Sequence, residues 1–190
     1  GGGFHSASDA DSDGGEGRFF TWTADELKTV TGKKDRAWLA SLYGVSEAGN
    51  FEGTNVLHLA APLSDADDYQ ALCKRLGPLR KALLTARKRR PAPFVDKKVI
   101  TEWNAMMITA LAEAGHLFER SDWTAAAERC AVFLWCQHRD ESGQLYRNSL
   151  EEQTSVVATL ADYGQLMLAM ISLFDATGQR DWLHKAHQLQ

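Results

Sequence analysis

The stretch "TEWNAMMITALAEAGHLFERSDW", residues 101–123, has a counterpart 59 positions later in "LADYGQLMLAMISLFDATGQRDW", residues 160–182. Each stretch predicts a long helix, a tight turn and a second helix that begins with Asp-Trp. Apolar residues coincide at the same offset: Met107 with Leu166, Leu111 with Met170, and further on Ala127 with Ala186. Repeated helical hairpins of this kind can stack, or can close into a ring of inner and outer helices.

The offset also aligns four polar or aromatic residues near the starts of the two long helices. Trp103 coincides with Asp162, and Asn104 coincides with Tyr163. If the hairpins form a ring, we expect these four side chains at one level of its inner wall.

Helical patterning precedes the repeat as well. Leucines recur at threes and fours between residues 63 and 90, where Ser64 is placed to cap a helix. Gly77-Pro78 should break or kink this helix. The stretch 139–154, which separates the two hairpins, is polar, and we expect a loop there.

The first third of the chain predicts a small β-ribbon with short helices. Residues 18–23 and 55–59 have the composition of strands and can pair with each other. Thr23 lies three residues before Glu26, which is the capping-box arrangement at the start of a helix. A second helical pattern ends at Gly44.

Alternating aspartates open the chain in a pattern that resembles a calcium-binding loop. Asp9, Asp11 and Asp13 are followed by Gly14, but the twelfth residue of such a loop should be a bidentate glutamate and is Phe20 here. We therefore favour a polar turn, in which short side chains bond nearby backbone amides, and expect no metal.

The composition limits the class of partner. The 190 residues are 44% hydrophobic and 24% charged, with a net charge of −4. This predicts a globular protein and offers nucleic acid no basic surface over the chain as a whole. No stretch approaches the roughly 18 apolar residues that span a membrane, so we expect no membrane partner.

One basic segment departs from this overall balance. "ARKRRP", residues 86–91, could contact a phosphate or act as a targeting patch. We favour a third reading, the solvated last turn of a helix, where cations offset the helix dipole.

The cysteines favour a reducing compartment. Cys73, Cys130 and Cys136 are odd in number and lack Cys-x-x-Cys spacing, so we expect reduced core thiols rather than disulfides or zinc ligands. A cytoplasmic location follows.

The chain begins without methionine and stops within an amphipathic pattern, so we expect it to be a piece of a longer protein.

Four separated motifs carry a resemblance to a known family: "SASDADSDGGEGRFFTW", "YGVSEAGNFEGTNVLH", "DKKVITEWNAMMITALAEAG" and "LADYGQLMLAMISLFDATGQRDWL". They resemble, in order and over nearly the whole chain, the YyaL and spermatogenesis-associated protein 20 family. The resemblance implies a thioredoxin-like domain before Gly1, then an α/α toroid similar to the six-hairpin glycosidases and N-acylglucosamine 2-epimerases.

On this basis we expect a mainly α protein that forms part of such a toroid. Residues 1–62 should hold a loop, a β-ribbon and short helices, and residues 63–190 should hold the repeated hairpins. The chain departs from the family pattern in three places, one of which is Ala105, where the family usually has a glycine after Trp-Asn. Val95-Asp96 and Ala161-Asp162 stand where the family usually has paired aspartates, which weakens any mechanism built on adjacent carboxylates.

Glycoside hydrolysis needs two carboxyl groups, roughly 5 Å apart for retention and 6.5 to 9.5 Å apart for inversion. Glu102, Asp96 and Asp162 are the candidates. Trp103 and Tyr163, with Asn104, could form an aromatic and polar surface for a sugar. The structural alternative is that the carboxylates offset helix dipoles and that Trp103 packs in the seam of the hairpin.

Epimerisation beside a carbonyl needs two proton-transfer groups, which are commonly histidines. His58 is the histidine that lies within a family-like motif, and it equally suits a local hydrogen bond. We expect the other five histidines at the surface.

Asp11 could lie on a loop over the mouth of the ring and touch a ligand. No nucleotide-binding, metalloprotease or serine-hydrolase motif occurs, and we expect no cofactor.

Two hypotheses therefore remain. The first is a carbohydrate-active domain, a hydrolase or an epimerase that acts in the cup of the ring. The second is a non-catalytic helical scaffold or binding module that accompanies the thioredoxin-like domain. They differ in whether Asp96, Glu102, Trp103, Asp162 and Tyr163 converge on one concave pocket or lie along packed seams.

Overall fold

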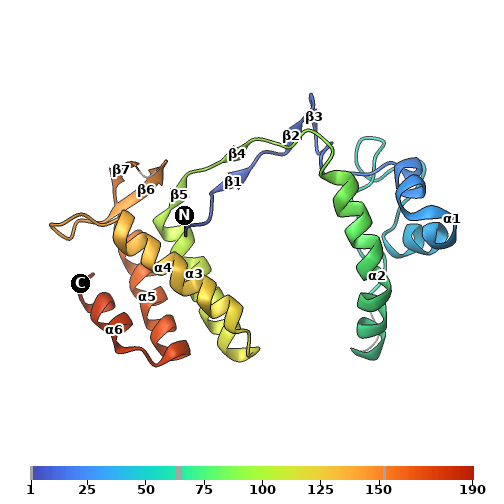
Figure 1. The fold of residues 1–190 in the computed structure, drawn as a ribbon. Coiled ribbons are helices and arrows are strands. Elements are labelled where there is room, and N and C mark those ends of the chain that lie inside the picture. Colours follow the sequence, from blue (N-terminus) through green and yellow to red (C-terminus); the bar gives the residue numbers. More distant parts are fainter. Residues whose placement is uncertain (1, 63–65, 152) are drawn as a thin grey trace. The chain divides into compact units, whose positions relative to one another are not determined.

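The computed structural model describes residues 2–62, 66–151 and 153–190, and the chain divides into two compact units (Figure 1). Unit 1 comprises Gly1–Ala7 and Val95–Gln190, and unit 2 comprises Ser8–Phe94. The sequence predicts a boundary at 62/63 instead. The difference arises because the helix that follows residue 63 buries its leucines Leu76 and Leu83 in the core of unit 2.

The helices of unit 2 are α1 (Ala24–Leu42) and α2 (Ala66–Arg87). The predicted capping box is present at the start of α1, because the Thr23 hydroxyl accepts from the Glu26 amide at 3.1 Å and the Glu26 carboxylate accepts from the Thr23 amide at 2.9 Å. Within α2 the chain stays helical through Pro78, so the predicted break does not occur. The predicted cap, Ser64, lies outside the described residues.

The predicted pair of strands is reduced to one bridge. Trp22 and Asn55 exchange two backbone hydrogen bonds of 2.9 and 2.8 Å, while residues 18–20 form a turn. The aspartate-rich segment forms a small hairpin instead, β2 (Asp11–Ser12) with β3 (Gly15–Glu16). Its turn residues Asp13 and Gly14 both have positive φ, 51° and 73°, as tight hairpin turns require.

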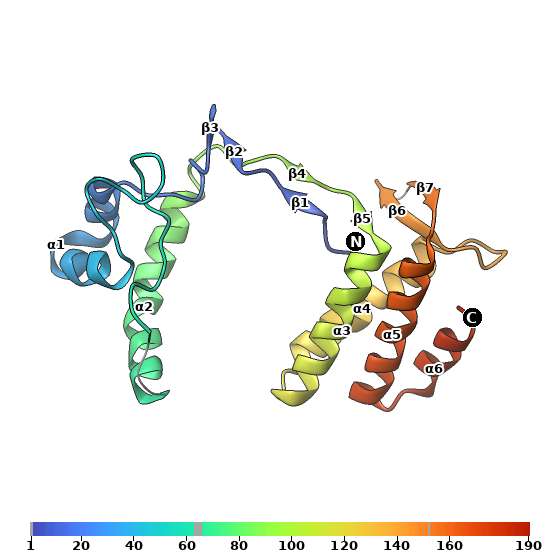
Figure 2. The same ribbon diagram turned by 180° about the vertical axis from the view of Figure 1, so that it is seen from behind.

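Unit 1 is built on the repeat that the sequence predicts. Its helices are α3 (Thr101–Leu117), α4 (Ser121–Gln137), α5 (Leu160–Thr177) and α6 (Arg180–His187). Both α5 and α6 begin 59 residues after α3 and α4, which confirms the repeat. The long helices α3 and α5 pack side by side, α3 also packs on α4, and α5 also packs on α6 (Figures 1 and 2).

In unit 1 an antiparallel sheet has the order β5 (Val99–Ile100), β6 (Tyr146–Leu150) and β7 (Gln153–Val157). A separate two-stranded sheet pairs β1 (Ala7–Ser8), which begins at the last residue of the first segment of unit 1, with β4 (Val95–Asp96). The prediction of a loop over 139–154 is therefore wrong for residues 146–150 and 153–154, which lie in β6 and β7. Four of the five β7 positions and the end of β6 face solvent, so the strands lack the alternation of a half-buried strand.

Small residues in the core of unit 1 let its helices approach closely. Ala105 and Ala112 of α3 are fully buried together with Ile108. A Cβ atom added at Gly115 would lie 2.5 Å from the Thr124 hydroxyl of α4, so only glycine fits this crossing. The structure thus confirms a mainly α protein with small antiparallel β elements.

The cysteines agree in most respects with the prediction of reduced core thiols. All three cysteines are free; Cys130 is buried, which raises its pKa to about 12, and Cys73 is partly buried. The expected core position is wrong for Cys136, which is exposed near the end of α4.

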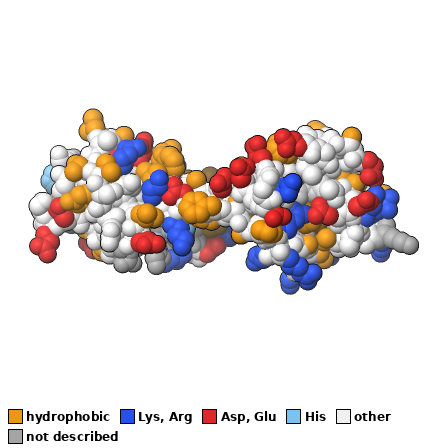
Figure 3. All heavy atoms as spheres, turned by 90° about the horizontal axis from the view of Figure 1, so that it is seen from above, with side chains coloured by type: hydrophobic (Ala, Val, Ile, Leu, Met, Phe, Trp, Pro, Cys, Tyr) orange, Lys and Arg blue, Asp and Glu red, His pale blue; other side chains and the backbone are white. Residues whose placement is uncertain are grey.

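On the face in Figure 3 both signs of charge are interspersed. Of the helices that the structure describes, none is long and apolar enough to cross a membrane.

Candidate functional site

The amino ends of α3 and α5 lie at the same end of unit 1 and share one carboxylate, that of Asp162. Asp162 is fully buried. One of its oxygens accepts from the Glu102 amide of α3 at 3.1 Å, and the other accepts from the Thr159 amide and hydroxyl, both at 2.8 Å. Because the first amides of a helix have no partner within the helix, this side chain satisfies backbone donors at two helix starts at once.

Arg147, on β6, connects this carboxylate to a second one. Its guanidinium donates to Asp162 at 2.9 Å and to Glu102 at 3.4 Å. The Arg147 side chain is 35% exposed and that of Glu102 is 26% exposed, whereas that of Asp162 is 0% exposed. Two of the three carboxylates that the sequence singles out, Glu102 and Asp162, are therefore joined by one guanidinium. A buried charge held in this way depends on all of its partners.

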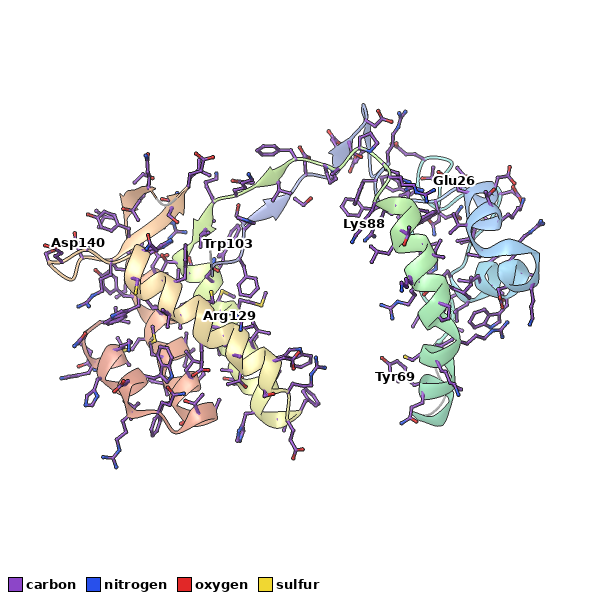
Figure 4. The ribbon with its side chains drawn as sticks, in the orientation of Figure 1. Glu26, Tyr69, Lys88, Trp103, Arg129 and Asp140 are labelled. Atoms are coloured by element: carbon purple, nitrogen blue, oxygen red, sulfur yellow. The ribbon has the colours of Figure 1, made fainter. Side chains whose placement is uncertain are left out.

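Trp103 and Asn104, which follow Glu102 on α3, differ sharply in their surroundings. Trp103 is 51% exposed at the amino end of α3 (Figure 4). Asn104 is buried, and its amide group donates to the Ile100 and Phe4 carbonyls at 2.9 and 3.1 Å and accepts from the Phe4 amide at 2.7 Å. Asn104 thus fastens the first residues of the chain to α3, while about half of the Trp103 side chain is open to solvent.

Tyr163 is fixed by the segment before β6. Its hydroxyl oxygen accepts from the Leu145 amide at 3.0 Å and from the Gln144 side chain at 3.1 Å. Its ring packs against the core of unit 1. These contacts give Tyr163 a structural function on α5.

The remaining predicted site residues do not join this group. Asp96 lies on β4, where hydrogen bonds from the Lys98 amide and then its ammonium hold the pKa of Asp96 below its usual range. His58 and Asp11 belong to unit 2. The His58 ring nitrogen lies 3.2 Å from the Val56 carbonyl, which is the local hydrogen bond that the structural alternative predicts. Asp11 is exposed, and its amide donates to the Asp9 carboxylate at 3.2 Å, as in the predicted polar turn.

A buried chain of side chains in unit 1 was not predicted. His138 lies between Thr101, 2.7 Å from Nδ1, and Ser149, 2.8 Å from Nε2. Since the Thr101 hydroxyl donates to the Tyr146 carbonyl at 2.6 Å, it accepts from His138 Nδ1–H, and His138 Nε2 then accepts from Ser149. Burial lowers the pKa of His138 to about 4.

The prediction that His138 is a surface residue is therefore wrong. The residue caps the carboxyl end of α4, but the β6 strand covers its ring. A serine bonded to a histidine is one element of nucleophilic catalysis. Here Ser149 is 2% exposed and His138 is 0% exposed, so no substrate reaches the pair. We assign it the task of docking the hairpin on α3 and α4.

A hollow of about 750 Å³ on unit 1 lies along α4. Its lining includes Val132, Phe133 and Trp182, and it includes none of the predicted site residues. Glu102, Trp103 and Arg147 thus lie, partly exposed, at the amino end of α3 and do not line this hollow. Arg147 was missed because the sequence around it predicts a loop.

No protein-family model matches the chain. An uncharacterized protein of Caenorhabditis elegans is 28% identical over all of this chain and 31% of its own length. Spermatogenesis-associated protein 20 of Homo sapiens and that of Rattus norvegicus are each 29% identical over all of this chain and 29% of their own length. The chain is therefore similar over its full length to spermatogenesis-associated protein 20, and it spans less than a third of the length of these relatives.

Proposed function

We propose that this chain is a non-catalytic binding module whose ligand is a carbohydrate, held at the amino ends of α3 and α5. One observation carries this proposal: the Arg147 guanidinium joins the carboxylates of Glu102 and Asp162. A two-carboxylate glycosidase needs the scissile bond between its carboxyl groups. Here an arginine is bonded to both, and Asp162 has both oxygens occupied, which favours binding over hydrolysis.

Three side chains on this surface suit a sugar. The half-exposed Trp103 ring offers an apolar face for stacking. Glu102 bonds Arg147 through one oxygen, and its other oxygen has no hydrogen-bond partner among the described residues. Arg147 is partly exposed and keeps donors for hydroxyl groups. A carboxylate, a guanidinium and an aromatic ring together match the alternating polar and apolar faces of a sugar.

A second candidate is the glycoside hydrolase or sugar epimerase that the family resemblance implies. The free oxygen of Glu102 favours it, because a half-buried carboxyl group can act as a general acid. This mechanism would require ligand binding to release Asp162 from Arg147. Epimerisation is less well supported, since His58 belongs to unit 2 and His138 is buried.

One experiment separates the two candidates. The chain is titrated with mono- and disaccharides, N-acetylated sugars included, by calorimetry, and reducing-sugar release is measured in the same samples. We expect saturable binding without release, and at least tenfold weaker binding for Trp103→Ala. Phe118→Ala is the matched control, because Phe118 is an exposed aromatic residue just past the opposite end of α3.

Two outcomes would contradict the proposal. Release of reducing sugar that Glu102→Gln abolishes would favour the hydrolase. Absence of binding to every sugar, in a chain that unfolds cooperatively, would leave the helical scaffold without a carbohydrate ligand.

We further propose that unit 1 is a segment of an α/α toroid. The support for this proposal is a difference in exposure between equivalent residues of α3 and α5. Met107 and Ala110 of α3 are exposed, whereas their counterparts 59 residues later, Leu166 and Ala169, are 0% exposed on α5, which packs on α3. The exposed stripe of α3 therefore has the character of a contact face for a preceding hairpin.

Matched glutamates test this part of the proposal. In the 190-residue chain, Met107→Glu should change the free energy of unfolding by less than about 0.5 kcal/mol, because the site is exposed. In a longer natural protein that contains this sequence, the same change should cost about 2 kcal/mol or more. An equally small effect in both proteins would contradict a further hairpin on this face.

In that longer protein we propose that the ring accompanies the thioredoxin-like domain that the resemblance implies. We also propose a cytoplasmic location, which the three free cysteines support.

A further inference from the structure

The basic face of α2 lines a pocket of about 500 Å³ in unit 2. Three cationic side chains contribute to it, those of Arg80, Lys81 and Arg87, and the lining contains no carboxylate. None of these three cations forms an ion pair with a described residue. The pocket therefore concentrates positive charge in a chain whose net charge is −4.

Helix-dipole compensation accounts for only part of this face. That effect falls off within the last turn of a helix. Arg87 is the final residue of α2, but Arg80 and Lys81 lie two turns earlier. Arg80 lies on the same face as Arg87, because seven residues make about two helical turns. Lys81 is six residues before Arg87 and lies farther around the helix, but it also lines the pocket.

Arg87 is held in place rather than extended into solvent. Its guanidinium carbon lies 5.5 Å from the Phe19 ring centroid and 6.0 Å from that of Phe20. Its Nε atom is buried and has no hydrogen-bond partner within the part of the chain that the structure describes. A guanidinium that is already ordered loses less side-chain entropy when it binds an anion, so this arrangement favours binding.

The rest of the lining is apolar or aromatic. Trp22 and Leu83 are 4% and 7% exposed, and Tyr43 and Leu57 are partly buried beside them. An apolar floor under three unpaired cations suits a ligand with an anionic group on an apolar body. We infer that this pocket binds a small organic anion, a phosphate or carboxylate attached to an aromatic or aliphatic group.

Titration of the 190-residue chain, followed by ¹H–¹⁵N NMR, tests this inference. The probes are phenyl phosphate, benzoate, inorganic phosphate and benzyl alcohol, and the reporters are the Arg87 Nε–H and the Trp22 indole N–H. We expect phenyl phosphate or benzoate to bind at least tenfold more tightly than inorganic phosphate and benzyl alcohol. The tighter of the two anions identifies the preferred head group.

Charge-removing variants give the matched comparison. Arg87→Gln and Lys81→Gln should each weaken binding of the aromatic anion at least fivefold. Lys88→Gln removes the same charge from a residue that directly follows α2 but does not line the pocket (Figure 4), and it should have less than a twofold effect. Because Lys81 is exposed, its variant should fold even if Arg87→Gln does not.

Three results would overturn the inference. The first is no saturable shift at either reporter with any anion. The second is equal binding of benzyl alcohol or of inorganic phosphate, which would indicate an apolar or a purely electrostatic contact. The third is a loss with Lys88→Gln as large as that with Lys81→Gln.

Discussion

Asp162 is a buried carboxylate that connects two helix starts and an arginine, and its substitution separates a structural function from a catalytic one. We predict that Asp162→Asn lowers the free energy of unfolding by about 3 kcal/mol, because it leaves the partly buried Arg147 without its main partner. Glu102→Gln should cost less than about 1 kcal/mol, since its contact with Arg147 is long and partly exposed. Urea denaturation followed by circular dichroism measures both.

A neutral or stabilising Asp162→Asn would contradict this account. It would indicate that the carboxylate is retained at a cost in stability, as groups in active sites often are.

His138 makes the stability of unit 1 depend on pH. Its pKa is about 4 in the folded protein, below its value of 6.5 in an unfolded chain, because burial opposes the charged ring. Below pH 6.5 the unfolded state therefore binds the proton first, and stability falls until pH 4 by up to about 1.4 kcal/mol per pH unit. His138→Gln should remove this component from the pH profile of the free energy of unfolding.

Comparing the pH profiles of the wild type and His138→Gln separates the contribution of His138 from that of the carboxylates, because the carboxylates titrate in both proteins. Parallel profiles between pH 4 and 6.5 would show that His138 is not the responsible group.

At the scale of single elements, α2 contains a proline that should destabilise the helix. Pro78 lies within the helix, where it removes the hydrogen bond to the carbonyl four residues earlier. We predict that Pro78→Ala stabilises unit 2 by about 1 to 2 kcal/mol, after allowance for the greater freedom of the unfolded chain. Thermal unfolding of this exposed-site variant measures the gain.

Gly77→Ala is the neighbouring control. A Cβ atom there meets nothing within 4 Å, so the gain should be about 0.5 to 1 kcal/mol from helix propensity alone. Destabilisation by Pro78→Ala would mean that the proline ring makes contacts worth more than the missing hydrogen bond.

The helices of unit 1 were predicted from the sequence and its strands were not, because only the helices depend on local patterns. The α3–α4 and α5–α6 hairpins follow from local periodicity, and the Thr23 capping box follows from two residues three apart. The β6–β7 hairpin was missed, because its strands are stabilised by docking on His138 and Thr101 rather than by an alternating pattern of their own. The strand predicted over 18–23 retains one bridge, at Trp22.

At the scale of the whole molecule, each unit has its own hydrophobic core. Leu39 lies in that of unit 2 and Leu166 in that of unit 1, and both are 0% exposed. We predict that Leu39→Ala and Leu166→Ala each cost about 2 to 5 kcal/mol, and that each loss is confined to the unit that contains the substitution. Hydrogen exchange resolved by mass spectrometry reports the two units separately.

Equal loss of protection in both units after either substitution would contradict independent cores. A wild-type chain that opens in one step for all protected amides would do the same.

The sequence by itself determined the repeat, the helix positions and the mainly α class, because helices depend on contacts three and four residues apart. Only the tertiary structure decided what the candidate site residues do. Trp103 and Asp162 occupy equivalent positions in the repeat, yet one is half exposed and the other fully buried, because α5 has α3 beside it. Arg147 reaches Glu102 across 45 residues and Asp162 across 15, and no local pattern encodes contacts at such separations.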